Sequence, residues 1–531
     1  MNLDKKLFLV VCCLFFTIYV FTSDGHRSTS DEDFLQQQAL RIVLQEPDPE
    51  FVLGESTNQF KHPEFIYPHG LGPKCTIGVL CYPVGIIHST TAVPFVFINH
   101  HLNLITTESV LFTAEDFPDP HYVFWRNSME PDLTFMELFY SPFFSSLSVA
   151  TFYLISRSFN YKITTSITLV LILGLSTIFF SYAQTSFNNA PSVFFVLLGF
   201  LFFKRFMVNQ KILYSTLSGI ALVFGFMIRA DVIYVIIALF FFLVLSVIFQ
   251  KTWTLSAVIQ KIKKIISFSI PIFLGYQLEK VIETMRYAVE PASNFSSDAA
   301  GLIFYFGAPN FPDMHATIGI LFSPGAGLFI YIPILLTVFF TFPDFFRKNK
   351  AYTFLFLGLS TIFILDFAGG NYWQGFTAWS PKYLYIIIPF LLLPLGASIE
   401  KRGKKILPII CILGCIGFFF NFVNIIQDVG WFVWGHPGGL ITGLMSLALD
   451  TGRSCDLYIC PEVTWTFQYS PLINSINLAV NNLYTDVFLL KVLGLQYYLL
   501  LLISILSIQF YLLYRMVKSN VIATVQNKKI F

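Results

Sequence analysis

A cluster of acidic residues directly follows the first apolar run of the chain, within SDGHRSTSDEDF at positions 23–34. Asp31, Glu32 and Asp33 are three consecutive carboxylates in a chain of which only 12% of the residues are charged. A carboxylate can remove a proton from an attacking hydroxyl group, which accelerates transfer roughly 10²–10⁴-fold. The next residues, FLQQQALRIV, predict a short amphipathic helix, and the helix dipole alone favours acids at its start. Capping and solvation are therefore the alternative to catalysis.

Two cations and a group of aromatic residues stand in other segments between apolar runs. Arg229 lies in GFMIRADVIY, and Lys382 follows the loop GGNYWQGFTAWSP. Such cations can bind a phosphate and stabilise the charge that develops on a leaving group. The loop also offers side chains that could hold a sugar or an acceptor: Asn371, Tyr372, Trp373 and Trp379. Interfacial Trp and Tyr residues are also ordinary membrane anchors, which is the alternative for this loop.

The composition indicates that these residues belong to an integral membrane protein. Hydrophobic residues make up 55% of the 531 positions, whereas charged residues fall well below the roughly 25% of soluble domains. A net charge of +2 gives no reason to expect nucleic-acid binding. We expect an all-α membrane protein with about twelve transmembrane helices. The apolar runs lie near 7–22, 138–157, 163–184, 191–207, 212–228, 231–250, 265–283, 318–342, 351–368, 382–399, 406–427 and 488–514.

The basic residues predict how these spans are oriented. If the N-terminus is cytoplasmic, 22 of the 33 Lys and Arg residues fall in seven short cytoplasmic stretches. The same stretches hold only three acids, which are Asp4, Asp344 and Glu400. Because cytoplasmic loops carry an excess of Lys and Arg, we expect both termini in the cytoplasm and the candidate chemistry at the extracytoplasmic face of the cell membrane.

The long polar segments are then extracytoplasmic, at 23–137, 284–317, 369–381 and 428–487. We expect a transmembrane domain at 1–427 that includes the first outer loop, an extracytoplasmic segment at 428–487, and a last helix with a cytoplasmic tail at 488–531. Two close cysteine pairs, Cys75 with Cys81 and Cys455 with Cys460, could form disulfides in an oxidising compartment, with free thiols as the alternative. Residues 75–98 are predicted to lie along the membrane surface, the alternative being a thirteenth span.

Four segments resemble the GT-C membrane glycosyltransferases, particularly the branch of protein O-mannosyltransferases and aminoarabinose transferases. SDEDFLQQQALRI is similar to the Asp-Glu motif in the first outer loop of that branch. GFMIRADVIY resembles its Arg-Pro turn, with Ala230 where Pro is common. LFSPGAGLFIYIPILL and YWQGFTAWSPKYLYIIIPFLLL resemble two further stretches, although Ser380 and Lys382 replace the usual Gly and Arg.

The resemblance implies an enzyme that passes a hexosyl or pentosyl group from a polyprenyl-phosphate donor to a protein, lipid or glycan acceptor, with inversion. Asp31 and Glu32 would be catalytic, and Arg229 and Lys382 would bind the donor phosphate. No cofactor is firmly implied; a divalent cation stays open, although Asn188 and Asn189 stand where many relatives carry an acid. Two alternatives are a multi-pass transporter or channel and a catalytically inactive structural subunit of the same fold.

Overall fold

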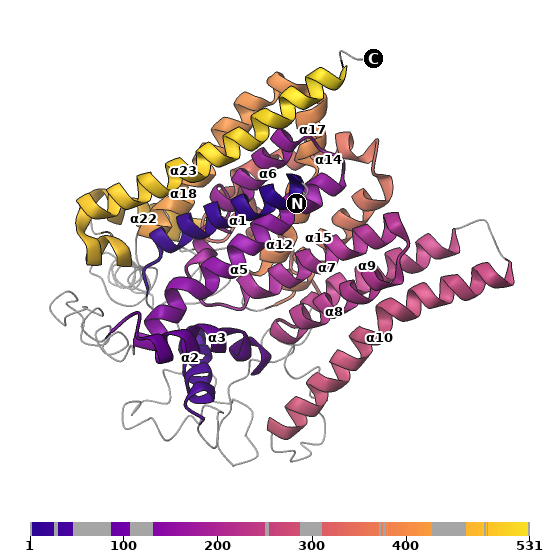
Figure 1. Cartoon of the computed structure of the whole chain (residues 1–531), viewed down its shortest axis with the longest axis horizontal. Helices are drawn as coiled ribbons and strands as arrows, with labels where there is room; N and C mark the ends of the chain where they lie inside the picture. The colour runs from indigo at the N-terminus through magenta and orange to yellow at the C-terminus, as the bar shows by residue number, and fades with distance from the viewer. Residues whose placement is uncertain are drawn as a thin grey trace.

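The computed structural model describes residues 3–25, 30–45, 86–106, 131–249, 254–286, 311–370, 373–374, 379, 381–426, 464–482, 485 and 487–528. These residues form helices joined by turns, and no strand occurs among them. Most helices run side by side in one bundle, while α2 and α3 lie together beside one end of it (Figure 1). The expectation of an all-α architecture is confirmed for this part of the chain.

The helices of the first half have the following bounds. They are α1 Leu3–Thr22, α2 Ser30–Val43, α3 Ile86–Leu102, α5 Pro131–Ser158, α6 Ile163–Leu175, α7 Asn189–Asn209, α8 Ile212–Ile228, α9 Val232–Ile248 and α10 Leu255–Arg286. A 3-10 turn, η4, covers Ser181–Ala183.

The second half contains shorter and more broken helices. They are α12 Met314–Phe322, α13 Leu328–Tyr331, η5 Pro333–Thr337, α14 Val338–Phe346, α15 Lys350–Ala368, η6 Lys382–Ile387, α16 Ile388–Leu392, α17 Leu395–Arg402, η7 Gly403–Lys405, α18 Leu407–Ile426, α22 Pro471–Asn482 and α23 Phe488–Lys528. Prolines at the start of η5 and near the start of α16 coincide with breaks in these apolar runs, because proline donates no backbone hydrogen bond.

The expected number of spans agrees with the structure. Eight helical segments of the described residues are long and apolar enough to cross a membrane, and four shorter apolar helices accompany them. Each of the twelve predicted runs overlaps one of these segments. The first run is longer than expected, because α1 begins at Leu3 and includes the two lysines before the apolar residues.

The centre of the bundle is a continuous apolar core in which aromatic rings face small residues. Tyr19 is fully buried, and its hydroxyl group donates a 2.9 Å hydrogen bond to the Gly174 carbonyl oxygen. A Cβ at Gly174 would lie 2.1 Å from the ring of Phe15. Helices in lipid gain stability mainly from such close packing, since lipid removes most of the hydrophobic drive between them.

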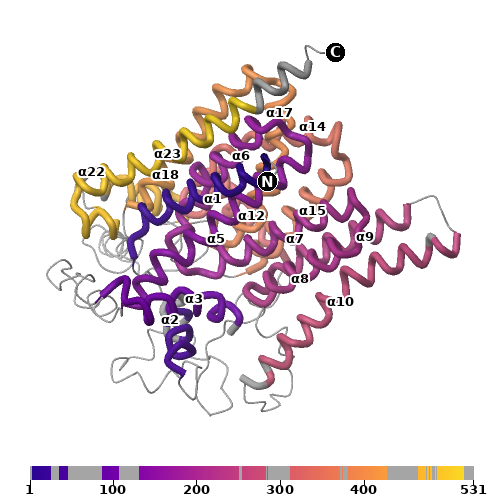
Figure 2. Tube along the Cα trace, viewed as in Figure 1, coloured from indigo at the N-terminus to yellow at the C-terminus, as the bar shows by residue number. Residues whose placement is uncertain are grey.

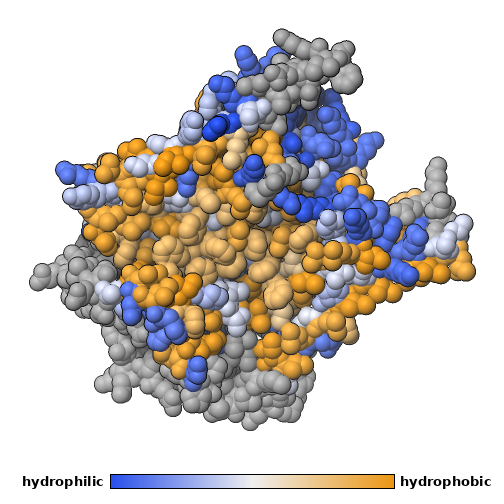
Figure 3. Space-filling view, in the orientation of Figure 1, coloured by the Kyte–Doolittle hydropathy of each residue, from blue (hydrophilic) through white to orange (hydrophobic). Residues whose placement is uncertain are grey.

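The first and last helices of the described residues meet at one edge of this core. The C-terminal helix α23 lies beside α1 (Figure 2) and is hydrogen-bonded to it where the Tyr498 hydroxyl group donates to the Phe21 carbonyl oxygen at 2.8 Å. Apolar residues fill the middle of the face in Figure 3, and hydrophilic residues gather at its upper right, over α14 and α17.

One end of the bundle, here called the basic end, joins residues from several of the predicted cytoplasmic stretches. Its three acids each pair with a cation of another stretch: Asp4 with Arg157 at 3.0 Å, Glu400 with Lys162 at 3.6 Å, and Asp344 with Lys401 and Arg402 at 2.5 and 2.7 Å. The four stretches that these residues belong to therefore lie at the same end of the molecule, as their charge pattern predicted. The opposite end, beside α2 and α3, is called the α2 end.

Candidate functional site at the α2 end

The helix α2 begins at the acidic cluster, so Asp31 and Glu32 lie in its first turn. Its apolar residues Leu35 and Ala39 are fully buried and join Leu133 and Met136 of α5 in one apolar cluster. The amphipathic helix predicted for this segment is thus present. Its apolar face packs against α5 near the start of that helix.

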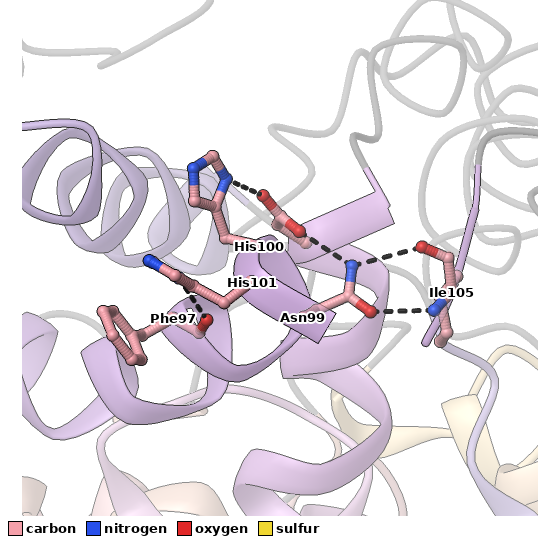
Figure 4. Close-up of polar contacts among 6 residues, drawn as sticks. Phe97, Asn99, His100, His101 and Ile105 are labelled. Atoms are coloured by element: carbon pink, nitrogen blue, oxygen red, sulfur yellow. Dashed lines mark hydrogen bonds and ion pairs between the residues drawn. The ribbon is translucent and has the colours of Figure 1, made fainter. Parts of the chain in front are cut away.

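The helix α3 is held against the start of α5 by a polar contact set (Figure 4). His100 Nδ1 lies 3.0 Å from Asp132 Oδ2, and Asn99 Nδ2 donates to Asp132 Oδ1 at 2.7 Å. Asn99 also exchanges two hydrogen bonds with the backbone of Ile105. Since α3 is not among the twelve apolar helical segments, the structure gives no support to a thirteenth span at its residues. Residues 75–85 lie outside the described residues.

Arg229 ends α8 and is buried together with an acid. Its Nη2 atom lies 2.7 Å from Asp231 Oδ2 and donates to the Tyr383 carbonyl oxygen at 3.4 Å. Nη1 has no hydrogen-bond partner among the described residues, although the side chain is only 8% exposed. Asp366, a residue of α15, is hydrogen-bonded to Tyr234. Its negative charge also acts on the carboxylate of Asp231. A buried guanidinium with an unused donor can still bind an anion.

Lys382 lies next to the backbone carbonyl that Arg229 contacts. Its Nζ atom is 3.8 Å from the centre of the Phe187 ring, a cation–π contact. The Lys382 carbonyl oxygen accepts a 3.1 Å hydrogen bond from Asn189 Nδ2. Arg229 therefore contacts the backbone one residue after Lys382, and Asn189 holds the Lys382 backbone itself. That the two cations share one phosphate stays a prediction.

The predicted sugar-binding aromatic residues separate into two places. Trp379 is 5% exposed, and its ring meets Tyr331 edge-on with centroids 4.9 Å apart. Its carbonyl oxygen accepts a hydrogen bond from the Tyr182 hydroxyl group, whereas its Nε1 atom has no partner among the described residues. Trp379 is therefore part of the aromatic core beneath the loop. Asn371 and Tyr372 lie outside the described residues.

Trp373 remains half-buried and belongs to an aromatic cluster that the sequence did not predict. Its ring lies over Gly319 of α12, where a Cβ would be 2.1 Å away. His315, one turn earlier on α12, has its ring centre 6.5 Å from that of Trp373 and 4.4 Å from that of Trp465. Trp465 comes from the segment before α22, so three distant parts of the chain form this cluster. Their spacing in the sequence carries no signal of it.

Glu137 is a second site feature that the sequence reading missed. It lies in the second turn of α5 and is fully buried. Its Oε1 atom accepts hydrogen bonds from Gln36 Nε2 of α2 and from Ser186 Oγ, the latter at 2.5 Å. A carboxylate directly before an apolar run was the available signal, because a helix that begins earlier includes it, and ionisable residues within spanning segments are functional candidates by default.

No group of three or more His, Cys, Asp or Glu side chains that could hold a metal ion is found among the described residues. The predicted disulfide cysteines at 75, 81, 455 and 460 lie outside those residues. The four described cysteines, at 12, 13, 411 and 415, are free.

With this geometry established, comparison with known families gives one match. Residues 137–268 match the family model described as dolichyl-phosphate-mannose-protein mannosyltransferase. The match begins at Glu137 and includes Asn189, Arg229 and Asp231. The resemblance to the O-mannosyltransferase branch is confirmed over this part of the chain. No curated protein matches the chain.

Two solved structures are similar at low identity. ArnT from Cupriavidus metallidurans, bound to undecaprenyl phosphate, is 10% identical, with 92% of this chain and 77% of that chain covered and a TM-score of 0.45. The Archaeoglobus fulgidus oligosaccharyltransferase, tethered to an acceptor peptide, is 10% identical, with 85% and 58% covered and a TM-score of 0.42. The chain thus covers less than two thirds of the second protein. Both TM-scores lie below 0.5, so the functional interpretation depends on the family match and on this chain's own residues.

Proposed function

We propose that the chain is a membrane glycosyltransferase that moves a sugar from a polyprenyl-phosphate donor to an acceptor hydroxyl group at the extracytoplasmic face. The observation that carries this proposal is the contact of Arg229 with the backbone beside Lys382. Arg229 reaches the Tyr383 carbonyl oxygen, one residue after Lys382. This contact supports one phosphate site at the α2 end that is shared by two cations from segments 153 residues apart.

Arg229 and Lys382 would receive the donor phosphate. Arg229 already shares its Nη2 atom with Asp231 and Tyr383, and its Nη1 atom is the donor that remains for a phosphate oxygen. A buried guanidinium acts in a medium of low dielectric, where stabilisation of a leaving phosphate is strongest. The polyprenyl chain would lie along the apolar helices, whose outward surfaces are exposed.

The first turn of α2 would supply the base. In this scheme Asp31 takes the proton of the acceptor hydroxyl group while the hydroxyl oxygen attacks the anomeric carbon of the sugar. The bond between that carbon and the phosphate oxygen breaks, and polyprenyl phosphate leaves with the electron pair. A single displacement of this kind inverts the anomeric centre. Trp373, with His315 and Trp465 beside it, offers ring faces for the sugar or the acceptor.

The family match favours this function over a transporter or channel, because the matched family is one of sugar-transferring enzymes. An inactive structural subunit would keep the same helices and would not need the buried cation beside Lys382. Reconstitution in sealed liposomes separates the alternatives. We expect the protein to release dolichyl phosphate from dolichyl phosphate mannose, or another polyprenyl phosphate from its sugar-linked form, in the presence of acceptor peptides and glycans.

Two readouts complete that experiment. Mass spectrometry of glycans from cells with and without the protein identifies the transferred sugar and its acceptor. Ion and solute flux through the same liposomes tests the transporter alternative. Release of no polyprenyl phosphate from the donor panel, together with an unchanged set of cellular glycans, would refute the proposed function.

A further inference from the structure

We infer that Glu137 is a positioning residue for this reaction, an inference that rests on the proposed function. Glu137 is fully buried, and no chemical step is assigned to it. Its side chain instead joins α2, which carries Asp31 and Glu32, to the segment that precedes α7. Through that connection it would set where the carboxylates stand relative to Lys382.

The burial of Glu137 shows that its hydrogen bonds matter for the local geometry. A carboxylate away from water costs several kcal/mol unless its oxygens are hydrogen-bonded or paired. Gln36 and Ser186 both donate to the same atom, Oε1, and come from positions 101 and 49 residues distant in the chain. Bonds to a buried charged group are directional and expensive to lose.

The apolar contacts of α2 do not fix its orientation in the same way. Leu35, Ala39 and Leu40 pack against α5 and α3, but hydrophobic contact has no preferred direction. The bond from Gln36 to Glu137, together with the 2.5 Å bond that Ser89 Oγ of α3 donates to Gln38 Oε1, fixes the rotation of α2 about its own axis. Of the two, only the bond to Glu137 connects α2 to α5. Positions 32 and 36 are one helical turn apart, so the bond constrains the backbone that carries the acidic cluster.

The connection continues from Ser186 to the phosphate-binding cations. Asn189 follows three residues later and donates to the Lys382 carbonyl oxygen at 3.1 Å. Arg229 contacts the carbonyl oxygen of the next residue, Tyr383. Glu137 therefore lies between the proposed base and the proposed phosphate ligands. The short segment Ser186–Asn189 and its hydrogen bonds connect it to Lys382, and the helix α2 connects it to the acidic cluster. A displacement of about 1 Å between such groups can lower a rate about 10²-fold.

The experiment compares Glu137→Met with Glu137→Gln in the full-length protein in liposomes, with dolichyl phosphate mannose, or the donor identified above, as the probe. Methionine removes the acceptor for both hydrogen bonds, and we expect kcat to fall about 10²-fold while the donor KM stays within about threefold. Glutamine keeps a carbonyl oxygen for Gln36 and Ser186 and should restore most of kcat. Gln36→Leu removes one of the two bonds and should give an intermediate loss, about tenfold.

Asp344→Leu is the matched control, because Asp344 is also a buried acid with several hydrogen bonds, but at the basic end. Both substitutions should lower thermal stability, yet only Glu137→Met should lower kcat of the folded fraction. Equal kcat losses in the two variants would show a merely structural role for Glu137. If Glu137→Met does not fold, Gln36→Leu and Ser186→Ala provide the same comparison, and wild-type kcat in both would overturn the inference.

The two proposals fail in different ways. Loss of transfer in Asp31→Asn with wild-type kcat in Glu137→Met would overturn the positioning role alone. Normal transfer in both Asp31→Asn and Arg229→Ala would overturn the proposed site itself.

Discussion

At the scale of single residues, the acidic cluster gives the most direct test of chemistry. Asp31→Asn nearly preserves the shape of the side chain and removes its charge. We expect transfer to fall at least about 10²-fold, the loss typical of a missing general base, while the protein still folds and inserts into the membrane. Activity assays in liposomes, with size-exclusion chromatography as the folding check, measure both.

The neighbouring carboxylates are the matched controls for that variant. Glu32→Gln should lower the rate less if Glu32 only supports Asp31, and Asp33→Asn least, since no catalytic role is assigned to Asp33. Near-normal glycosylation by Asp31→Asn would leave capping and solvation as the role of the cluster.

Arg229 combines a structural with a proposed binding role, and a double substitution separates them. Arg229→Ala leaves Asp231 buried without its partner, which should cost about 3–5 kcal/mol of stability and raise the donor KM. Adding Asp231→Asn removes the unpaired charge, so the double variant should regain stability without regaining donor binding. Thermal unfolding and donor titration measure the two effects. Recovery of both in the double variant would contradict phosphate binding by Arg229.

At the scale of elements, the sequence predicted more of the spanning helices than of the site. Apolar runs about 20 residues long mark spans by length alone, and basic residues mark their ends, so the twelve runs and their common basic end could be predicted. The amphipathic pattern after Asp33 likewise predicted α2. Trp373, His315 and Trp465 meet only through tertiary packing, and nothing in the local sequence of any one of them indicates the others.

The docking of α3 should depend on pH through His88. Burial lowers the pKa of His88 to about 3, and its Nε2 atom has no hydrogen-bond partner among the described residues. The unfolded segment therefore binds a proton near pH 6.5, whereas the docked one stays neutral. Stability is full above that pH and falls as pH decreases, by about 2 kcal/mol at pH 5. Hydrogen exchange of α3 at pH 7 and pH 5 measures this change.

His88→Leu is the comparison for that experiment, because leucine fills a similar buried volume and does not titrate. The variant should show little difference in α3 exchange between the two pH values. An equal pH dependence in both proteins would assign the effect to other groups. The contact between His100, at the other end of α3, and Asp132 of α5 is present in both proteins, so it does not contribute to the difference between them.

At the scale of the whole molecule, the charges outside the core divide the bundle into two unlike ends. The basic end is tied together by ion pairs between stretches up to 238 residues apart, as in Lys162 with Glu400. Lys204 adds a buried cation there, 3.9 Å from the centre of the Tyr352 ring and 4.1 Å from that of Phe159. The α2 end instead carries the acidic helix and the two candidate phosphate ligands.

This asymmetry predicts the orientation in the membrane. Lys348 is exposed at the basic end, and His315 is exposed beside Trp373 and Trp465. We expect Lys348→Cys to react with an impermeant thiol reagent only after the cytoplasmic face is opened, and His315→Cys to react in intact cells. The unsubstituted protein, treated in parallel, gives the background from the native cysteines. Labelling of position 348 from outside would reverse the topology, and the proposed transfer from an extracytoplasmic donor would be excluded, because the cations and the acidic helix would then face the cytoplasm.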